Sequence, residues 1–201
     1  QAGISYQTVK NAILETATAQ EGTDNAILIY HDNFYKNIPT MQVMVAATPT
    51  IGIWNPRLTL ALVKQWLTME SLGEEIKLNQ ALPVIQFGNT LTLPKGFTLN
   101  CDYTFQGKGD SRVYRLQKST NTLNASVRKS FFKNALAVEV FANNILDDES
   151  TETRVYSKSY SLRQLSKMSM RTYGVTLRYN FNTAQSKYKG TGAGKSQKAR
   201  M

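Results

Sequence analysis

The sequence predicts an all-β protein: an antiparallel, up-and-down transmembrane β-barrel segment with about nine strands of a larger barrel. Three observations lead to this fold class. Apolar and polar residues alternate strictly in several segments, short and long connections alternate along the chain, and strongly polar residues stand opposite the apolar positions. The 201 residues suffice for one large domain. No apolar run approaches about 18 residues, which excludes a helical membrane protein.

Alternation is clearest from Tyr173 to Phe181, where odd-numbered residues are apolar and even-numbered residues are small or polar. A period of two is typical of a strand with one apolar and one polar face. The same pattern, in more or less regular form, predicts strands at about 3–20, 25–36, 41–54, 58–66, 85–93, 97–105, 123–131 and 136–142. Helical periodicity is weak and is confined to residues 64–78.

The connections carry further information. Tight turns are expected at Trp54-Asn55-Pro56, Pro94-Lys95-Gly96 and Phe132-Lys133-Asn134, whose residues tolerate sharp reversal. Long polar connections are expected at 70–83, 107–121 and 147–169. In a meander, consecutive connections lie at opposite ends of the sheet. The sequence therefore predicts one end with tight turns and one with long loops, an asymmetry typical of outer-membrane barrels.

The two faces of the strands have different predicted surroundings. The polar residues would need buried partners in a soluble core, whereas a water-filled lumen satisfies them. We therefore expect these residues to face the lumen: Asn100, Asp102, Arg128, Arg178 and Asn180. The apolar residues should face lipid: Leu58, Leu60, Leu62, Phe97, Leu99, Cys101, Tyr103, Phe105, Tyr173, Val175, Leu177, Tyr179 and Phe181. The interfacial aromatic residues should be Trp54, Trp66 and Phe131. The alternative to a lipid-facing barrel is an antiparallel sheet with one solvated face, which explains the alternation in any single strand equally well.

Two segments carry a family resemblance. "FFKNALAVEVFANNILDD" followed, after a loop, by "RTYGVTLRYNFN" resembles the last hairpin of TonB-dependent receptor barrels. Asn143, Asn144, Ile145, Leu146 and Asp147 match the Asn-rich end of one strand, and residues 171–181 match the final strand. "GIWNPRLTLAL" and the tail "NTAQSKYKGTGAG" look like the subgroup whose barrel follows a carboxypeptidase-regulatory-like domain and a plug. The resemblance implies a Gram-negative outer-membrane barrel of 22 strands, an internal plug and energy from the TonB system.

The chain is expected to be the C-terminal part of such a barrel. It has too few residues for 22 strands, and residues 1–182 are assigned to the barrel segment. The expected partners are outer-membrane lipid, the missing N-terminal strands and plug of the same protein, and the TonB system. Residues 183–201 are predicted to form a flexible basic tail rich in Gly, Ser and Lys.

Other chemistry has weaker support. The tail segment "KGTGAGKS" approaches the phosphate-binding loop motif, but Lys189 replaces its first Gly and too few residues follow for the required helix. His31 is the sole histidine, so we predict no His-rich metal site. We also predict no catalytic site and no cofactor: His31 and Asp32 are expected mid-strand without a second acidic pair at the same height, and His31 is interpreted as a girdle or lumen residue. Asp147, Asp148 and Glu149 form an acidic cluster that could hold calcium or simply be solvated. Nucleic-acid binding is not expected, because the aromatic residues do not cluster with Lys and Arg.

The predicted function is therefore non-enzymatic: ligand capture by external loops and uptake across the outer membrane. Two alternatives stay open. One is a structural or adhesive outer-membrane barrel that transports nothing, and the other is a soluble barrel that binds a small ligand inside. The sequence does not identify a substrate, because recognition would depend on loops and a plug.

Overall fold

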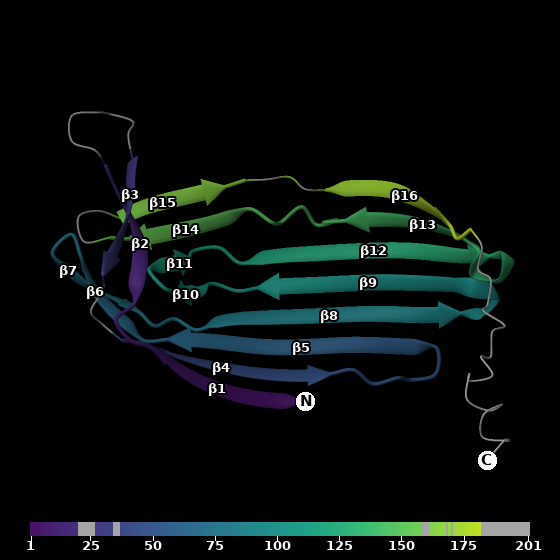
Figure 1. Cartoon of the computed structure of the whole chain (residues 1–201), viewed down its shortest axis with the longest axis horizontal. Helices are drawn as coiled ribbons and strands as arrows, with labels where there is room; N and C mark the ends of the chain where they lie inside the picture. Colours follow the sequence, from purple (N-terminus) through teal and green to yellow (C-terminus); the bar gives the residue numbers. More distant parts are fainter. Residues whose placement is uncertain (20–26, 34–36, 158–160, 168, 170, 182–201) are drawn as a thin grey trace, which may run out of the picture.

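A long, curved antiparallel sheet forms the body of the protein (Figure 1). The computed structural model describes residues 1–19, 27–33, 37–157, 161–167, 169 and 171–181. Eight strands make up this main sheet, in the order β1 (Ala2–Val9), β4 (Ile38–Ala47), β5 (Trp54–Gln65), β8 (Leu82–Leu93), β9 (Phe97–Gln106), β12 (Thr120–Phe131), β13 (Leu136–Asn143) and β16 (Thr172–Tyr179). The described residues include no helix long and apolar enough to cross a membrane.

The main sheet is an open meander. Every neighbouring pair is antiparallel, and the strands follow one another in chain order once the inserted hairpins are set aside. The two edge strands, β1 and β16, do not pair with each other, so the sheet is not closed. The all-β, antiparallel fold predicted from the sequence is thus confirmed.

The predicted number of nine strands is wrong for this sheet, which has eight. The extra predicted strand, at about 25–36, corresponds to β3 (Ile27–Asn33), which pairs with β2 (Ile13–Ala19) in a separate hairpin. The expected strand at 3–20 is therefore two strands, β1 and β2. The expected strand at 41–54 ends earlier, since β4 stops at Ala47.

Two of the three predicted tight turns are confirmed. Short 3₁₀ segments, η1 (Pro94–Gly96) and η2 (Phe132–Asn134), reverse the chain, and Lys95 and Asn134 take left-handed φ values of 61° and 71°. The turn expected at 54–56 is wrong, because Trp54 already begins β5. The reversal lies just before it, where Ile51 and Trp54 form a backbone bridge.

The long connections are folded, which corrects the expectation of polar loops, and the weak helical periodicity at 64–78 does not correspond to a helix. β6 (Leu67–Ser71) and β7 (Glu74–Leu78) form a hairpin. β10 (Gly109–Ser111), β11 (Tyr114–Leu116), β14 (Thr151–Tyr156) and β15 (Ser161–Ser166) form a four-stranded sheet. The signal was the period of two within each strand: Leu67 and Met69 are buried in β6, and Ile76 and Leu78 are the less exposed residues of β7. A hairpin with a two-residue turn forms here because it buries these apolar side chains, which a polar loop would not do.

The buried core of the protein lies at this end. Leu67, Met69, Leu78, Val113 and Tyr156 belong to one cluster of buried residues, contributed by the short hairpins and by β14. Figure 1 places these short strands together at one end of the main sheet, and η1 and η2 at the other. We call the short-strand end, made of β6, β7, β10, β11, β14 and β15, the folded end. The predicted separation of tight turns and long connections is confirmed, but the long connections pack as a unit.

Candidate functional site

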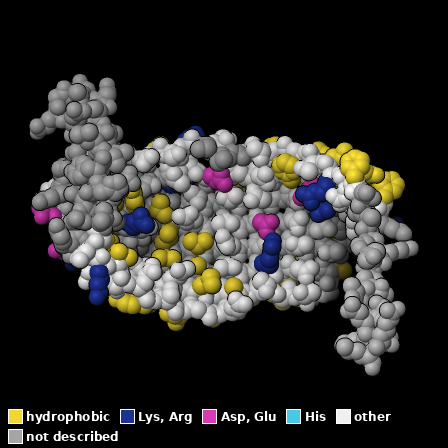
Figure 2. Space-filling view, viewed as in Figure 1, with side chains coloured by type: hydrophobic (Ala, Val, Ile, Leu, Met, Phe, Trp, Pro, Cys, Tyr) yellow, Lys and Arg dark blue, Asp and Glu magenta, His cyan; other side chains and the backbone are white. Residues whose placement is uncertain are grey.

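One face of the main sheet is polar along its middle. Directly opposite residues in neighbouring strands point to the same side, and the register aligns Arg57, Gly88 and Asp102 in one row. A second row joins Asn55, Thr90, Asn100 and Ser126. In the view of Figure 2, hydrophobic side chains are sparse over the middle of the sheet, and acidic and basic side chains lie next to one another. We call this surface the polar face.

Side chains of the polar face are joined across strands. Arg57 Nη2 lies 3.1 Å from Asp102 Oδ1. The Thr90 hydroxyl donates to Asn100 Oδ1 at 3.0 Å, and Asn100 Nδ2 donates to the Ser126 hydroxyl at 3.2 Å. These contacts leave donors and acceptors free for water or solute, since Arg57 and Asp102 side chains are about half exposed. The polar face can therefore be wetted without leaving buried groups unsatisfied.

A hollow of about 390 Å³ lies on this face, and Asn100, Asp102, Asn124, Glu139 and Phe141 are among the residues that line it. Phe141 lies directly opposite Gly174, and a Cβ at Gly174 would be 2.5 Å from the end of its ring. Gly174 therefore provides the space for the one aromatic ring in the lining of this hollow. The size of the hollow suits a small polar ligand or a cluster of waters.

The predicted lumen-facing residues fall into two groups. Asn100, Asp102, Arg128 and Arg178 share the polar face, with Arg128 opposite Glu139 and Arg178 opposite Ala137. Asn180 lies beyond the end of β16, where its backbone N–H and its side chain donate to the carbonyls of Ala135 and Asn134. We predict that water covers this face in the closed barrel.

The opposite face of the main sheet is apolar and exposed. Its rows align the predicted lipid-facing residues of different strands: Leu60 with Phe105 through Ile85, Leu58 with Tyr103 through Phe87, and Leu99 with Val175 through Val127 and Val140. Val175 and Leu177 are each 69% exposed. An apolar surface this extensive is not stable in water and marks an interface with another apolar phase. Lipid remains the predicted occupant.

The predicted interfacial aromatic residues lie at strand ends. Trp54 begins β5 and donates to Asn89 Oδ1 at 3.0 Å, and Trp66 directly follows β5 with Lys64 Nζ 5.5 Å from its ring. Twelve extended residues span about 40 Å. At the tilt of about 45° that is usual for barrel strands, the two indoles would be about 28 Å apart along the membrane normal. This span is close to the apolar band of about 25 Å in outer-membrane barrels.

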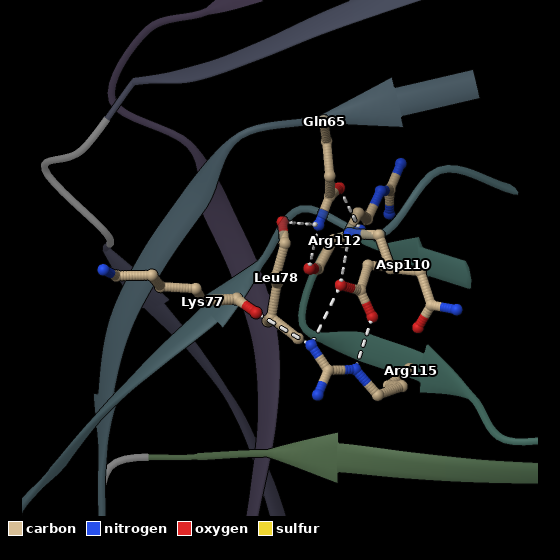
Figure 3. Close-up of polar contacts among 7 residues, drawn as sticks. Gln65, Lys77, Leu78, Asp110, Arg112 and Arg115 are labelled. Atoms are coloured by element: carbon tan, nitrogen blue, oxygen red, sulfur yellow. Dashed lines mark hydrogen bonds and ion pairs between the residues drawn. The ribbon is translucent and has the colours of Figure 1, made fainter.

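The folded end is tied to the main sheet by buried polar groups (Figure 3). Gln65, at the end of β5, donates from Nε2 to the Arg112 carbonyl at 2.7 Å and accepts the Arg112 N–H at 2.6 Å. Asp110 is fully buried and receives Arg115 Nε at 2.7 Å, Arg115 Nη2 at 3.0 Å and the Gln80 N–H at 2.8 Å. The hydrogen bond to Asp110 raises the pKa of the Arg115 guanidinium above its ordinary value. Sequence reasoning missed Gln65, Asp110 and Arg115, because nothing in their spacing indicates that they meet.

The Asn-rich motif forms the turn that ends β13. Asn144 has a left-handed φ of 49°, and its N–H donates to Asn124 Oδ1 at 2.8 Å. The Asp147 N–H donates to the Asn144 carbonyl at 3.0 Å. Left-handed backbone is tolerated best by Gly and Asn, which explains an Asn at this position. The motif therefore has a structural role where the chain leaves the main sheet.

In the acidic cluster at 147–149, the carboxylates of Asp148 and Glu149 accept hydrogen bonds from neighbouring side chains. Asp148 accepts Lys118 Nζ at 2.7 Å and Asn121 Nδ2 at 2.6 Å, and Glu149 accepts the Thr122 hydroxyl at 3.2 Å. The hydrogen bonds from Lys118 and Asn121 lower the pKa of Asp148. Within the described ranges, no group of three or more His, Cys, Asp or Glu residues could hold a metal ion. His31 is placed in β3 opposite Glu15, while the tail, including "KGTGAGKS", lies outside the described residues.

Comparison with known proteins decides the family. The model of the "Outer membrane protein beta-barrel family" matches residues 1–179. The chain belongs to this family. Neither a search of curated proteins nor a search of solved structures gives a match. Membership in the outer-membrane barrel family accounts for the exposed apolar face and the polar face together, since lipid covers one and water the other in such barrels. The protein is therefore an outer-membrane barrel protein.

Proposed function

We propose that the protein is the barrel part of a TonB-dependent receptor-like transporter of a Gram-negative bacterium, which captures a ligand at the folded end and passes it across the outer membrane. The observation that carries the proposal is the polar face of an open eight-stranded sheet. A sheet that lines a wide, wet passage needs such a face, and needs more strands to close. The motif at Asn143–Asp147 and the strand at 171–181, which resemble the last hairpin of these receptors, also support it.

We propose the following mechanism. The folded end would hold the ligand, and movement of an internal plug, driven by the TonB system, would open the passage along the polar face. The paired side chains Arg57–Asp102 and Thr90–Asn100–Ser126 would then be in contact with water or plug residues. In this proposal no step is catalytic, and no metal or cofactor takes part.

The alternative within the same family is a structural or adhesive barrel without transport. The observation in its favour is the buried core of the folded end, which would support a rigid outer surface suited to adhesion. The test is whether the protein, produced from its native gene and extracted in detergent, binds the purified periplasmic domain of TonB. Binding, together with a large conductance that appears in planar bilayers only after mild urea treatment, is expected of a plugged transporter. No TonB binding and an unchanged conductance would leave the structural alternative.

A further inference from the structure

Three arginines lie side by side across the sheet of the folded end. The register places Arg115 of β11 opposite Arg154 of β14, and Arg154 opposite Arg163 of β15. Side chains in directly opposite positions are close neighbours, and like charges there are destabilising. Such a row therefore needs compensating negative charge.

The two outer arginines of this row, Arg115 and Arg163, each have a carboxylate partner. Arg115 is held by the buried Asp110, with Nε 2.7 Å from Oδ1. Arg163 Nε lies 2.7 Å from Glu152 Oε1, a contact that raises the pKa of the Arg163 guanidinium. Each carboxylate thus balances one arginine at an end of the row.

The central arginine has no carboxylate partner among the described residues. Arg154 Nη2 donates to the Ser161 hydroxyl at 3.2 Å, and its guanidinium carbon lies 5.6 Å from the centre of the Tyr156 ring. Both contacts are with neutral groups. Three guanidinium groups and two carboxylates leave the row with one formal positive charge, centred on Arg154.

A hollow of about 330 Å³ opens over this charge. Its lining consists of Gln117, Glu152, Arg154, Ser161 and Arg163. The lining supplies two guanidinium groups, a hydroxyl and an amide as donors. The planar fork of arginine matches carboxylate and phosphate oxygens, which it binds through paired hydrogen bonds. The volume is at the small end of the range for ligand sites, which suits a single anionic group and its immediate substituents.

We propose that this hollow binds an oxyanion, a phosphate or carboxylate group, through Arg154 and Arg163 with Ser161 as an additional donor. The bound anion supplies the negative charge that the arginine row lacks. Glu152 forms an ion pair with Arg163 and therefore competes with the anion for the Arg163 guanidinium. This competition limits the affinity of the hollow for any anion. The proposal does not depend on transport, because it requires only that the folded end is outside the bilayer. The anionic group can come from a soluble ligand or from a phosphorylated lipid headgroup.

The test measures anion binding by the protein extracted from outer membranes in a zwitterionic detergent. The probes are inorganic phosphate and acetate as soluble anions, and micelles carrying phosphorylated lipid A as the lipid source. Arg154→Gln should weaken binding of the preferred probe by about tenfold, which corresponds to about 1.4 kcal/mol. Arg112→Gln is the matched control, because it removes the same charge from the β10–β11 turn without touching the hollow; it should change binding by less than about twofold.

A second variant makes a prediction of opposite sign. Glu152→Gln frees Arg163 and should strengthen binding severalfold, a result that loss of folding cannot imitate. Binding of phosphate or acetate identifies a soluble-anion site, and binding of lipid A alone identifies a headgroup site. The proposal is overturned if none of the three probes binds, if Arg154→Gln and Arg112→Gln have equal effects, or if Glu152→Gln weakens binding.

Discussion

Arg57 and Asp102 lie on strands that are not neighbours, yet their side chains are 3.1 Å apart. Between them, on β8, stands Gly88, whose lack of a side chain opens the space in which the pair meets. A Cβ at Gly88 would lie 2.6 Å from Asp102 Oδ1 and 3.1 Å from Arg57 Nε. One glycine thus allows an ion pair to join β5 and β9 across the polar face.

The ion pair should contribute little to stability but should depend on Gly88. In a double-mutant cycle of Arg57→Ala and Asp102→Ala, the coupling energy should be about 0.2–1 kcal/mol, because both side chains are about half exposed. In a Gly88→Ala background the coupling should vanish. Unfolding in detergent, followed by tryptophan fluorescence, gives the free energies of unfolding. A coupling that survives in Gly88→Ala would show that the pair does not need the glycine.

The single cysteine offers a direct test of the apolar face. Cys101 is exposed and lies near the middle of β9, between Asn89 and Ala125 in neighbouring strands. A spin label on Cys101 in reconstituted bilayers should be accessible to oxygen, which dissolves in lipid, and shielded from a water-soluble nickel complex. The control is a label at Thr104 in a Cys101→Ser background, on the polar face of the same strand, which should show the reverse. Equal accessibility at both positions would contradict the assignment of faces.

The buried carboxylate of the folded end should be its most sensitive position. Asp110→Asn removes the charge that balances Arg115 and should destabilise the folded end by about 3 kcal/mol. Asp110→Leu combined with Arg115→Met should lower the stability of the folded end by less than Asp110→Asn does, because the double variant leaves no unpaired charge. Trp66 fluorescence in a Trp54→Phe background reports unfolding near this end of β5. If the double variant were as unstable as Asp110→Asn, shape and not charge would dominate at this site.

The turn after β13 should be sensitive to acid. The pKa of Asp148 is lower in the folded protein than its ordinary value of 3.8, because Lys118 and Asn121 donate to the carboxylate. A lowered folded pKa stabilises the fold at pH above the ordinary value, and this stabilisation is lost as the pH falls through the lowered pKa. The carboxyl ¹³C shift of Asp148 should therefore titrate below pH 3.8, and Lys118→Met should raise the midpoint. An unchanged midpoint in Lys118→Met would remove Lys118 as the cause.

The strands of the main sheet were predictable because a period of two is a local property of the sequence. Leu99 and Asn100 are assigned to opposite faces by position alone, and the register agrees. The folded end was not predictable in the same way. Asp110 and Arg115 are joined by a short hairpin, and Gln65 meets Arg112 across 47 positions in sequence. Neither contact leaves a periodic pattern. The turn at 54–56 was misplaced because Asn and Pro are common in turns but can also stand near the start of a strand, as Asn55 and Pro56 do in β5.

The strand from Thr172 to Tyr179 should be the position at which the main sheet needs another chain segment. β16 pairs with β13 on one side, from Leu136 opposite Tyr179 to Asn143 opposite Thr172, and has no strand on the other side among the described residues. In water such an edge recruits another chain, and in lipid unpaired backbone groups are not viable.

The 201-residue chain produced alone should therefore aggregate or misassemble. Co-expression with the upstream part of the same gene should restore a folded species that resists detergent until it is heated, seen as a shift in gel mobility of unheated samples. Val175→Pro is the matched probe of the edge. The Asn180 N–H donates to the Ala135 carbonyl, so even-numbered residues of β16 direct their N–H groups to β13 and odd-numbered residues direct theirs to the open edge. Val175→Pro should therefore block assembly with the upstream part, whereas Thr176→Pro should disturb the pairing with β13. Ile4→Pro, at an outward-facing N–H of β1, should block the same closure from the other side. A monomeric, folded 201-residue chain that shifts on heating would mean that β1 and β16 close on each other, and a small self-contained barrel would then replace the larger one.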